Sequence, residues 1–234
     1  MINQTYRLLG RGIPQVGREV GDFLQRVSAG NVLFRRGVQA YLEHGGIPEA
    51  FQGPLRQMMI QEQEGEALRR LAETHLLGLI EEGERYTATF ELLERLGALL
   101  HRMARTLAAF DIEHPVIPSG FHPDIRELTE PVSLAVEGAV EAAGSLLKNT
   151  LPPEEYLTRV SFYEKEADKF EDRLLRAIFA SNLPLDAKGH LRHFIERIDE
   201  PADIAEELVT WLSIHRVSSG LDTLRHDLGG HGAL

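Results

Sequence analysis

The sequence predicts an all-α protein built as two pseudo-repeated three-helix bundles. Apolar residues recur at spacings of three and four through long segments, as on one face of a helix. No segment alternates with the two-residue period of a strand for long. Proline and glycine gather in four short stretches that separate the periodic segments, at 45–54, 111–124, 150–153 and 182–189.

These breakers leave room for six helices, which we expect at residues 17–44, 54–83, 86–110, 125–149, 153–181 and 188–217. The second helix carries an apolar stripe that includes Leu68, Ala72 and Leu76. The last helix carries a similar stripe through Ile198, Ala202, Ala205, Val209 and Leu212. The order is short helix, long helix, long helix, a proline-rich loop, and then the same series again.

The repeated order indicates an internal duplication, and an offset of 102 residues aligns the two halves without a gap. EQEGE at 62–66 falls on EKEAD at 164–168, and ERL at 94–96 falls on ERI at 196–198. Identity between the halves is near chance, but acidic clusters and helix ends coincide. We therefore expect a single domain over 1–234 with internal repeats at about 17–110 and 125–217.

Composition narrows the functional class. The 234 residues carry a net charge of −11, which disfavours a nucleic-acid partner and favours cationic ligands. The absence of cysteine excludes disulfides, thiolate catalysis and cysteine-based zinc sites. No apolar run approaches the length of a transmembrane helix, and the start of the chain has no clear signal-peptide pattern. We expect a cytoplasmic protein.

The stretch ERIDEPADIAEEL at 196–208 allows two interpretations. A helix that restarts here would use Asp199 or Glu200 as its cap, with Pro201 in the first turn. A continuous helix would instead carry Asp199 and Asp203 through the proline, at the cost of one backbone hydrogen bond and about 3 kcal/mol. The apolar phase runs through Pro201, and the equivalent stretch at 94–106 has no proline, so the continuous helix is favoured.

Two acidic pairs are candidate metal ligands. Glu164 with Asp168, and Asp199 with Asp203, are each four residues apart and so share a helix face. A short connection at 182–187 would pack the two helices side by side and bring the pairs together. A cation with oxygen ligands would relieve the repulsion among the four carboxylates. Alternatively, the acids lie on exposed faces and pair with basic neighbours, namely Lys165, Arg173 or Arg197.

Residues 164–208 resemble the PhoU-like phosphate transport regulators, in particular the accessory proteins of Pit-type inorganic phosphate transporters. The family motif is an E-x-E-A-D helix, a Pro-x-Asp turn and a helix with I-D-x-x-A-D. The matching residues here are Glu164, Glu166, Ala167 and Asp168; Pro184 and Asp186; and Ile198, Asp199, Ala202 and Asp203. The resemblance is strong over this stretch and extends less strongly over about 17–217.

The resemblance implies two three-helix bundles, regulation of phosphate uptake without catalysis, and a Pit-type phosphate permease as partner, with membrane contact through the permease only. We also expect a homo-oligomer. Some family members hold multinuclear metal clusters through E/D-x-x-x-D motifs. The metal ligands implied here, for a divalent or trivalent ion, are Glu164, Asp168, Asp199, Asp203, Glu62 and Glu66. The first half departs from the pattern, because Gly97 and His101 stand where the second half has two aspartates.

Other functional classes find less support. There is no G-x-x-x-x-G-K-[ST] phosphate loop, no G-x-S-x-G nucleophile motif and no Glu-x-x-His pair of the ferritin-like di-iron bundles. Two alternatives to a regulator stay open: a structural helical-bundle adaptor without metal, and a metal-dependent phosphohydrolase built on a helical bundle.

Overall fold

The structure is a computed structural model that describes residues 14–44, 49–78, 87–147 and 154–229. Within these residues the regular structure is entirely helical, which confirms the predicted all-α class. The helices are α1 (Pro14–His44), α2 (Glu49–Leu77), α3 (Thr87–Glu113), the short 3₁₀ helix η2 (Ser119–Phe121), α4 (His122–Leu147), α5 (Glu154–Ala180) and α6 (Leu185–Gly229).

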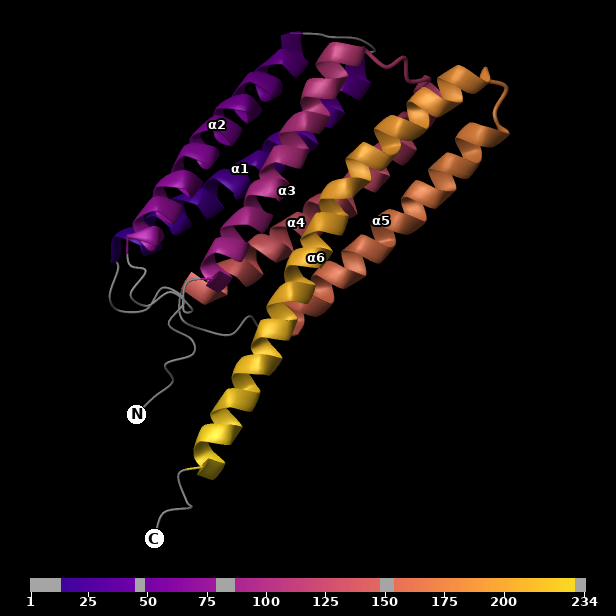
Figure 1. Cartoon of the computed structure of the whole chain (residues 1–234). Helices are drawn as coiled ribbons and strands as arrows, with labels where there is room; N and C mark the ends of the chain where they lie inside the picture. The colour runs from indigo at the N-terminus through magenta and orange to yellow at the C-terminus, as the bar shows by residue number, and fades with distance from the viewer. Residues whose placement is uncertain (1–13, 45–48, 79–86, 148–153, 230–234) are drawn as a thin grey trace.

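The six long helices form two three-helix groups that lie side by side (Figure 1). In the first group α1 packs against α2 and α3, and in the second α4 packs against α5 and α6. The groups meet where α1 contacts α4 and where α3 contacts α6. Helices α2 and α5 therefore lie on opposite outer sides, and each faces the third helix of its own group.

One continuous apolar core runs through both groups. The core contains a series of contacting aromatic rings, in which Tyr41 and Phe51 contact Phe110. Phe110 of α3 in turn contacts Phe194 of α6, with 4.8 Å between the ring centroids. Because burial of apolar area drives folding, this shared core fixes α3 against α6 and makes the two groups one packed unit.

The internal repeat at an offset of 102 residues remains a prediction, and one contact is consistent with it. The side-chain amide of Asn31 in α1 donates a hydrogen bond of 2.9 Å to the carbonyl oxygen of Ser133 in α4, a residue 102 positions later. Residues related by a twofold axis can touch only near that axis. The contact is therefore what two repeats related by an axis between α1 and α4 would produce.

Several helix ends differ from the expected ones, and two helices extend furthest beyond them. Helix α2 begins at Glu49, before the expected start at 54, and so contains Pro54. The proline removes the hydrogen bond to the carbonyl of Ala50, an exposed residue in the first turn whose carbonyl water can reach. Helix α6 continues to Gly229, beyond the expected end at 217.

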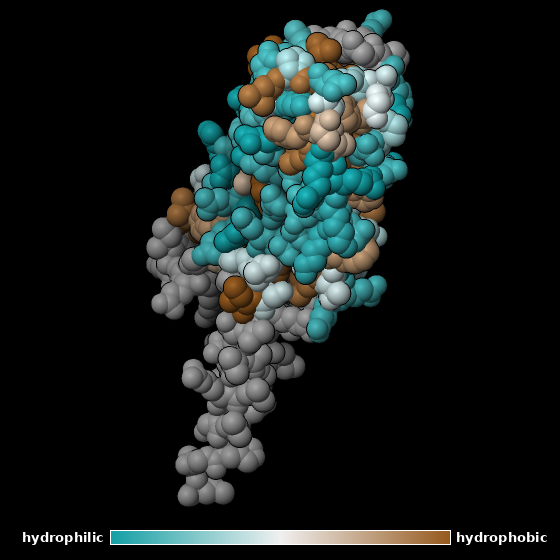
Figure 2. All heavy atoms as spheres, turned by 90° about the vertical axis from the view of Figure 1, so that its right-hand side faces the viewer, coloured by the Kyte–Doolittle hydropathy of each residue, from teal (hydrophilic) through white to brown (hydrophobic). Residues whose placement is uncertain are grey.

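Hydrophilic side chains cover most of the middle of the face formed by the second group (Figure 2). In the described ranges, no helix combines the length and the apolar character that crossing a bilayer requires.

Candidate metal centre

Helix α6 runs without a break through Pro201, so the continuous-helix interpretation is confirmed. Asp199 therefore lies inside the helix, fifteenth from its start at Leu185, and is not the cap of a new helix. Asp199 and Asp203 share one face of α6, as their four-residue spacing requires.

The turn between α5 and α6 makes these helices antiparallel neighbours (Figure 1). Helix α5 ends at Ala180, and the Ser181 backbone N–H and hydroxyl both donate to the carbonyl oxygen of Ile178. Four residues, 181–184, separate α5 from α6, which begins at Leu185. The acid-bearing faces of both helices therefore meet.

Two groups of three carboxylates form between α5 and α6, and they share Asp168. The first consists of Glu164, Asp168 and Asp203, and the second of Asp168, Glu171 and Asp199. In each group, one oxygen from every residue lies within 4.8 Å of the others. Ligand bonds of about 2.0–2.6 Å put opposite ligands of one ion about 4–5 Å apart, so each group has the dimensions of a cation site.

The carboxylates of this centre differ in burial. Asp199 is only 4% exposed, whereas Asp168 and Asp203 are exposed to solvent. The Oδ1 atom of Asp199 and the Oε2 atom of Glu164 are buried and have no hydrogen-bond partner in the protein. Buried carboxylate oxygens normally have partners, so these two atoms indicate a missing one. Asp199 lines a pocket of about 460 Å³ that opens between α3, α5 and α6.

Glu164, Glu171, Asp199 and Asp203 have raised pKa values. Burial, and then the charges of Glu171, Asp203, Asp168 and Glu164, raise the pKa of Asp199 to about 8. Burial and neighbouring acids, Glu206 first for Glu164 and Glu196 first for Glu171, raise the pKa of each of these two residues to about 7. Burial and the nearby Asp168 also raise the pKa of Asp203. A bound cation would reverse this effect, because it favours the charged form of every ligand.

All four acids predicted in the second half thus come together, with one addition. Glu171 was not among the residues expected from the sequence, yet it completes the second group with Asp168 and Asp199. It lies three residues after Asp168 and seven after Glu164, which is the spacing of one helix face. The E-x-x-x-D-x-x-E pattern was the available signal.

The alternative in which basic neighbours neutralise these acids finds little support for Arg173. Its guanidinium instead reaches α4, where it lies 2.6 Å from Glu127 and 3.3 Å from Asp124. Arg102 of α3 lines the pocket but pairs with Glu200, at 2.7 Å, and Glu200 belongs to neither carboxylate group.

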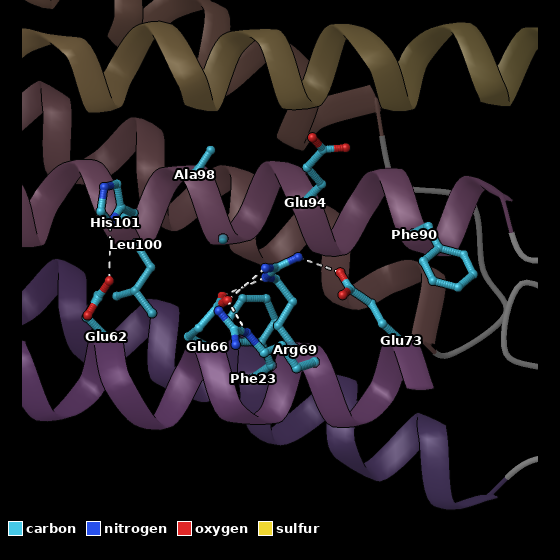
Figure 3. A pocket seen from close by; sticks show the side chains of 12 residues that line it. Phe23, Glu62, Glu66, Arg69, Glu73, Phe90, Glu94, Ala98, Leu100 and His101 are labelled. Atoms are coloured by element: carbon cyan, nitrogen blue, oxygen red, sulfur yellow. Dashed lines mark hydrogen bonds and ion pairs between the residues drawn. The ribbon is translucent and has the colours of Figure 1, made fainter. Parts of the chain in front are cut away.

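The first half presents a different arrangement (Figure 3). A pocket of about 630 Å³ lies between α2 and α3, over the buried ring of Phe23. Glu62 lies 3.1 Å from Nδ1 of His101, and Glu66 is bound by the guanidinium groups of Arg69 and Arg70. In the part of the chain that the structure describes, neither Glu62 nor Glu66 joins a group of three metal-ligand side chains.

The arginines determine the protonation state of Glu66. Its hydrogen bond with Arg69, together with Arg70 and the charge of both, lowers the pKa of Glu66 to about 2 despite partial burial. The charged form is therefore stabilised within the protein itself, in contrast to the carboxylates of the second half.

Comparison with known proteins supports the fold assignment. No protein-family model matches the sequence, and no curated protein matches it either. Two crystal structures from Shewanella oneidensis MR-1 are similar in fold. One is named as a PhoU-like phosphate regulatory protein; it is 18% identical with a TM-score of 0.74, over 87% of this chain and 100% of its own.

The second structure is named as a PhoU-like protein. It is also 18% identical, with a TM-score of 0.71 over 86% of this chain and 99% of its own. At this identity the similarity establishes the fold: the chain is an all-α protein of the PhoU-like architecture. The carboxylate centre described above is a property of this chain's own residues.

Proposed function

We propose that this protein is a non-enzymatic regulator of inorganic phosphate transport that binds a metal ion through the carboxylates between α5 and α6. One observation carries the metal assignment: buried Asp199 has an unpartnered carboxylate oxygen and belongs to a cluster of acids that opens to solvent. The regulatory role is supported by the PhoU-like fold and by the resemblance of residues 164–208 to accessory proteins of Pit-type transporters.

The donor set indicates the class of ion. Both groups offer only carboxylate oxygens, which suit hard cations such as Mg²⁺, Mn²⁺ and Ca²⁺ better than they suit metals that prefer sulfur. Asp168 belongs to both groups and could bridge two ions. A divalent or trivalent ion would offset the mutual repulsion of five carboxylates in a small volume.

Metal binding is tested on chelator-treated protein that is refilled with Mn²⁺, Mg²⁺ or Ca²⁺ and analysed by titration calorimetry and elemental analysis. Asp168→Asn should weaken binding at least tenfold, because it removes a ligand from both groups. Asp172→Asn on the same helix is the matched control; Asp172 is exposed and pairs with Arg176. Equal binding by the two variants would contradict the proposal.

The partner we propose is a Pit-type phosphate permease, contacted at its cytoplasmic side. Phosphate uptake is compared in cells that carry the permease with no added chain, with the wild-type chain, or with either variant. We expect the wild-type chain and Asp172→Asn to change uptake and Asp168→Asn to lose part of that effect. An uptake rate that is the same with and without the chain would contradict a role in transport.

The same purified samples test the alternatives. A structural adaptor without metal would leave metal content unaffected by every substitution. A phosphohydrolase would release phosphate from a generic phosphomonoester in a manner that depends on Asp168. We expect no such turnover from this protein.

A further inference from the structure

The carboxylate centre of the second half has five positions, and each has a counterpart in the first half at the offset of 102 residues. The counterparts are Glu62 for Glu164, Glu66 for Asp168, Arg69 for Glu171, Gly97 for Asp199 and His101 for Asp203. Two of these pairs change the chemistry fundamentally. A glutamate is replaced by an arginine, and the most buried aspartate is replaced by a glycine.

The arginine is held firmly. Nε and Nη2 of Arg69 bind the two oxygens of Glu66, at 2.8 and 2.9 Å, in a two-point contact. Its Nη1 atom lies 2.5 Å from Glu73, one turn further along α2. Figure 3 shows the guanidinium between the two carboxylates. Because a planar guanidinium matches a carboxylate in geometry, such pairs are the stronger kind of ion pair.

The glycine provides the space that the arginine occupies. A Cβ atom placed on Gly97 would lie 3.0 Å from Cδ and 3.3 Å from Nε of Arg69. The side chain of Arg69 therefore crosses from α2 to the backbone of α3 at Gly97, the residue that the 102-residue offset pairs with Asp199. An acidic side chain at position 97 would contact the aliphatic part of the Arg69 side chain, and a longer side chain at 97 would displace Arg69.

We propose that Arg69 is the built-in cation of the first half: its guanidinium takes the place that a metal ion takes in the second half. The half-site between α2 and α3 then needs no external ion, and it keeps its charge balance at any metal concentration. Only the α5–α6 site responds to metal. The charge balance of the first half is therefore constant, and that of the second half changes with bound metal. The comparison with a metal ion rests on the proposed function, whereas the contact between Arg69 and Gly97 does not.

The main test replaces Arg69 and Gly97 with the residue types of their second-half counterparts, in the double variant Arg69→Glu with Gly97→Asp. Both changes are made in the Asp168→Asn background, so that the second-half centre does not contribute. Binding of Mn²⁺ alone is measured by titration calorimetry, and circular dichroism and thermal melting report folding. The exchanged protein should bind Mn²⁺ at least tenfold more tightly than its Asp168→Asn parent.

The matched control is Arg56→Glu with Gly53→Asp in the same background. Both control residues lie on α2 and undergo the same change of charge as the exchanged pair, but neither lines the pocket. A folded exchanged protein that binds Mn²⁺ no better than this control would overturn the proposal. If the wild-type protein binds no metal but the exchanged protein does, the proposed function fails and the inference about Arg69 stands.

A second measurement decides the case in which the exchanged protein does not fold. Gly97→Ala is made in the wild-type protein and in Arg69→Ala, and melting temperatures are compared without metal. The alanine should lower the melting temperature in the wild type, because it presses on Arg69, and should have a smaller effect or the opposite one when Arg69 is absent. The same shift in both backgrounds would show that Arg69 does not fill this space and would overturn the proposal.

Discussion

The side-chain hydroxyl of Thr106 donates a hydrogen bond to the backbone carbonyl oxygen of Arg197, at 3.1 Å. Arg197 lies four residues before Pro201, and proline has no N–H to complete the helical hydrogen bond to that carbonyl. The fully buried Thr106 of α3 therefore offers the donor that α6 lacks. The same hydroxyl lies 3.0 Å from the carbonyl of Arg102, its own residue i−4, so its single proton is shared between two acceptors.

Replacing Thr106 with valine should destabilise the protein by about 1–3 kcal/mol, because it leaves a carbonyl in a buried interface without a donor while keeping the side-chain volume. Urea unfolding followed by circular dichroism measures the effect. In a Pro201→Ala background the alanine N–H can bond Arg197, so Thr106→Val should cost clearly less there. An equal loss in both backgrounds would mean that the hydroxyl does not compensate for the proline.

The metal-free protein should lose stability as the pH rises from about 4 to 8. The pKa of Asp199 is about 8 in the folded protein and about 3.9 in an unfolded chain. Between these values the folded state binds more protons than the unfolded state, so the free energy of unfolding falls with increasing pH. Glu164 and Glu171, each with a pKa of about 7, act in the same direction.

Asp199→Asn should therefore flatten this dependence and raise the urea midpoint at pH 8 in the presence of a chelator. Asp172→Asn removes an exposed acid from α5 and serves as the control for total charge. A wild-type midpoint that rises between pH 5 and pH 8 would contradict the assigned directions.

Bound metal should stabilise the folded protein at pH 8. An ion that binds only the folded state stabilises it by about 2.7 kcal/mol at a concentration 100 times its dissociation constant. Wild-type protein at pH 8 should therefore melt at a higher temperature with Mn²⁺ than with chelator, and Asp168→Asn should show a much smaller difference. The same rise in both proteins would point to binding elsewhere on the acidic surface.

Two glycines of α2 should respond in opposite ways to alanine. A Cβ atom on buried Gly65 would lie 2.7 Å from a methyl group of Leu100 and 3.3 Å from the ring of Phe23, whereas one on Gly53 meets nothing within 4 Å. Gly65→Ala should destabilise by about 1–3 kcal/mol through overpacking. Gly53→Ala should stabilise by up to about 1 kcal/mol through helix propensity. Thermal melting of the pair checks this, and a stabilising Gly65→Ala would show that α2 can shift away from α3.

Much of the fold could be read from local pattern. Helical periodicity and clusters of proline and glycine depend on residues close together in the chain, and they predicted six helices that the structure contains. The two acidic pairs and the continuous helix through Pro201 follow from the same regularity. Glu171 could also have been predicted from the sequence, because its spacing from Asp168 is that of residues on one helix face. The end of α6 at Gly229 was not predicted, and the helix continues 12 residues beyond the expected end at 217.

What the sequence determined by itself is therefore the set of helices and the acids that share a face, because a helix repeats every 3.6 residues whatever surrounds it. Tertiary structure decided which of those acids meet across two helices and which of them are buried. Glu66 and Asp168 are equivalent in pattern, yet Asp168 meets the acids of α6, whereas Glu66 is bound by Arg69, whose side chain lies against Gly97 of α3. Likewise, Pro201 is accommodated by Thr106, 95 positions earlier in the chain. Such contacts depend on side-chain direction and on the distance between helices, which local sequence does not specify.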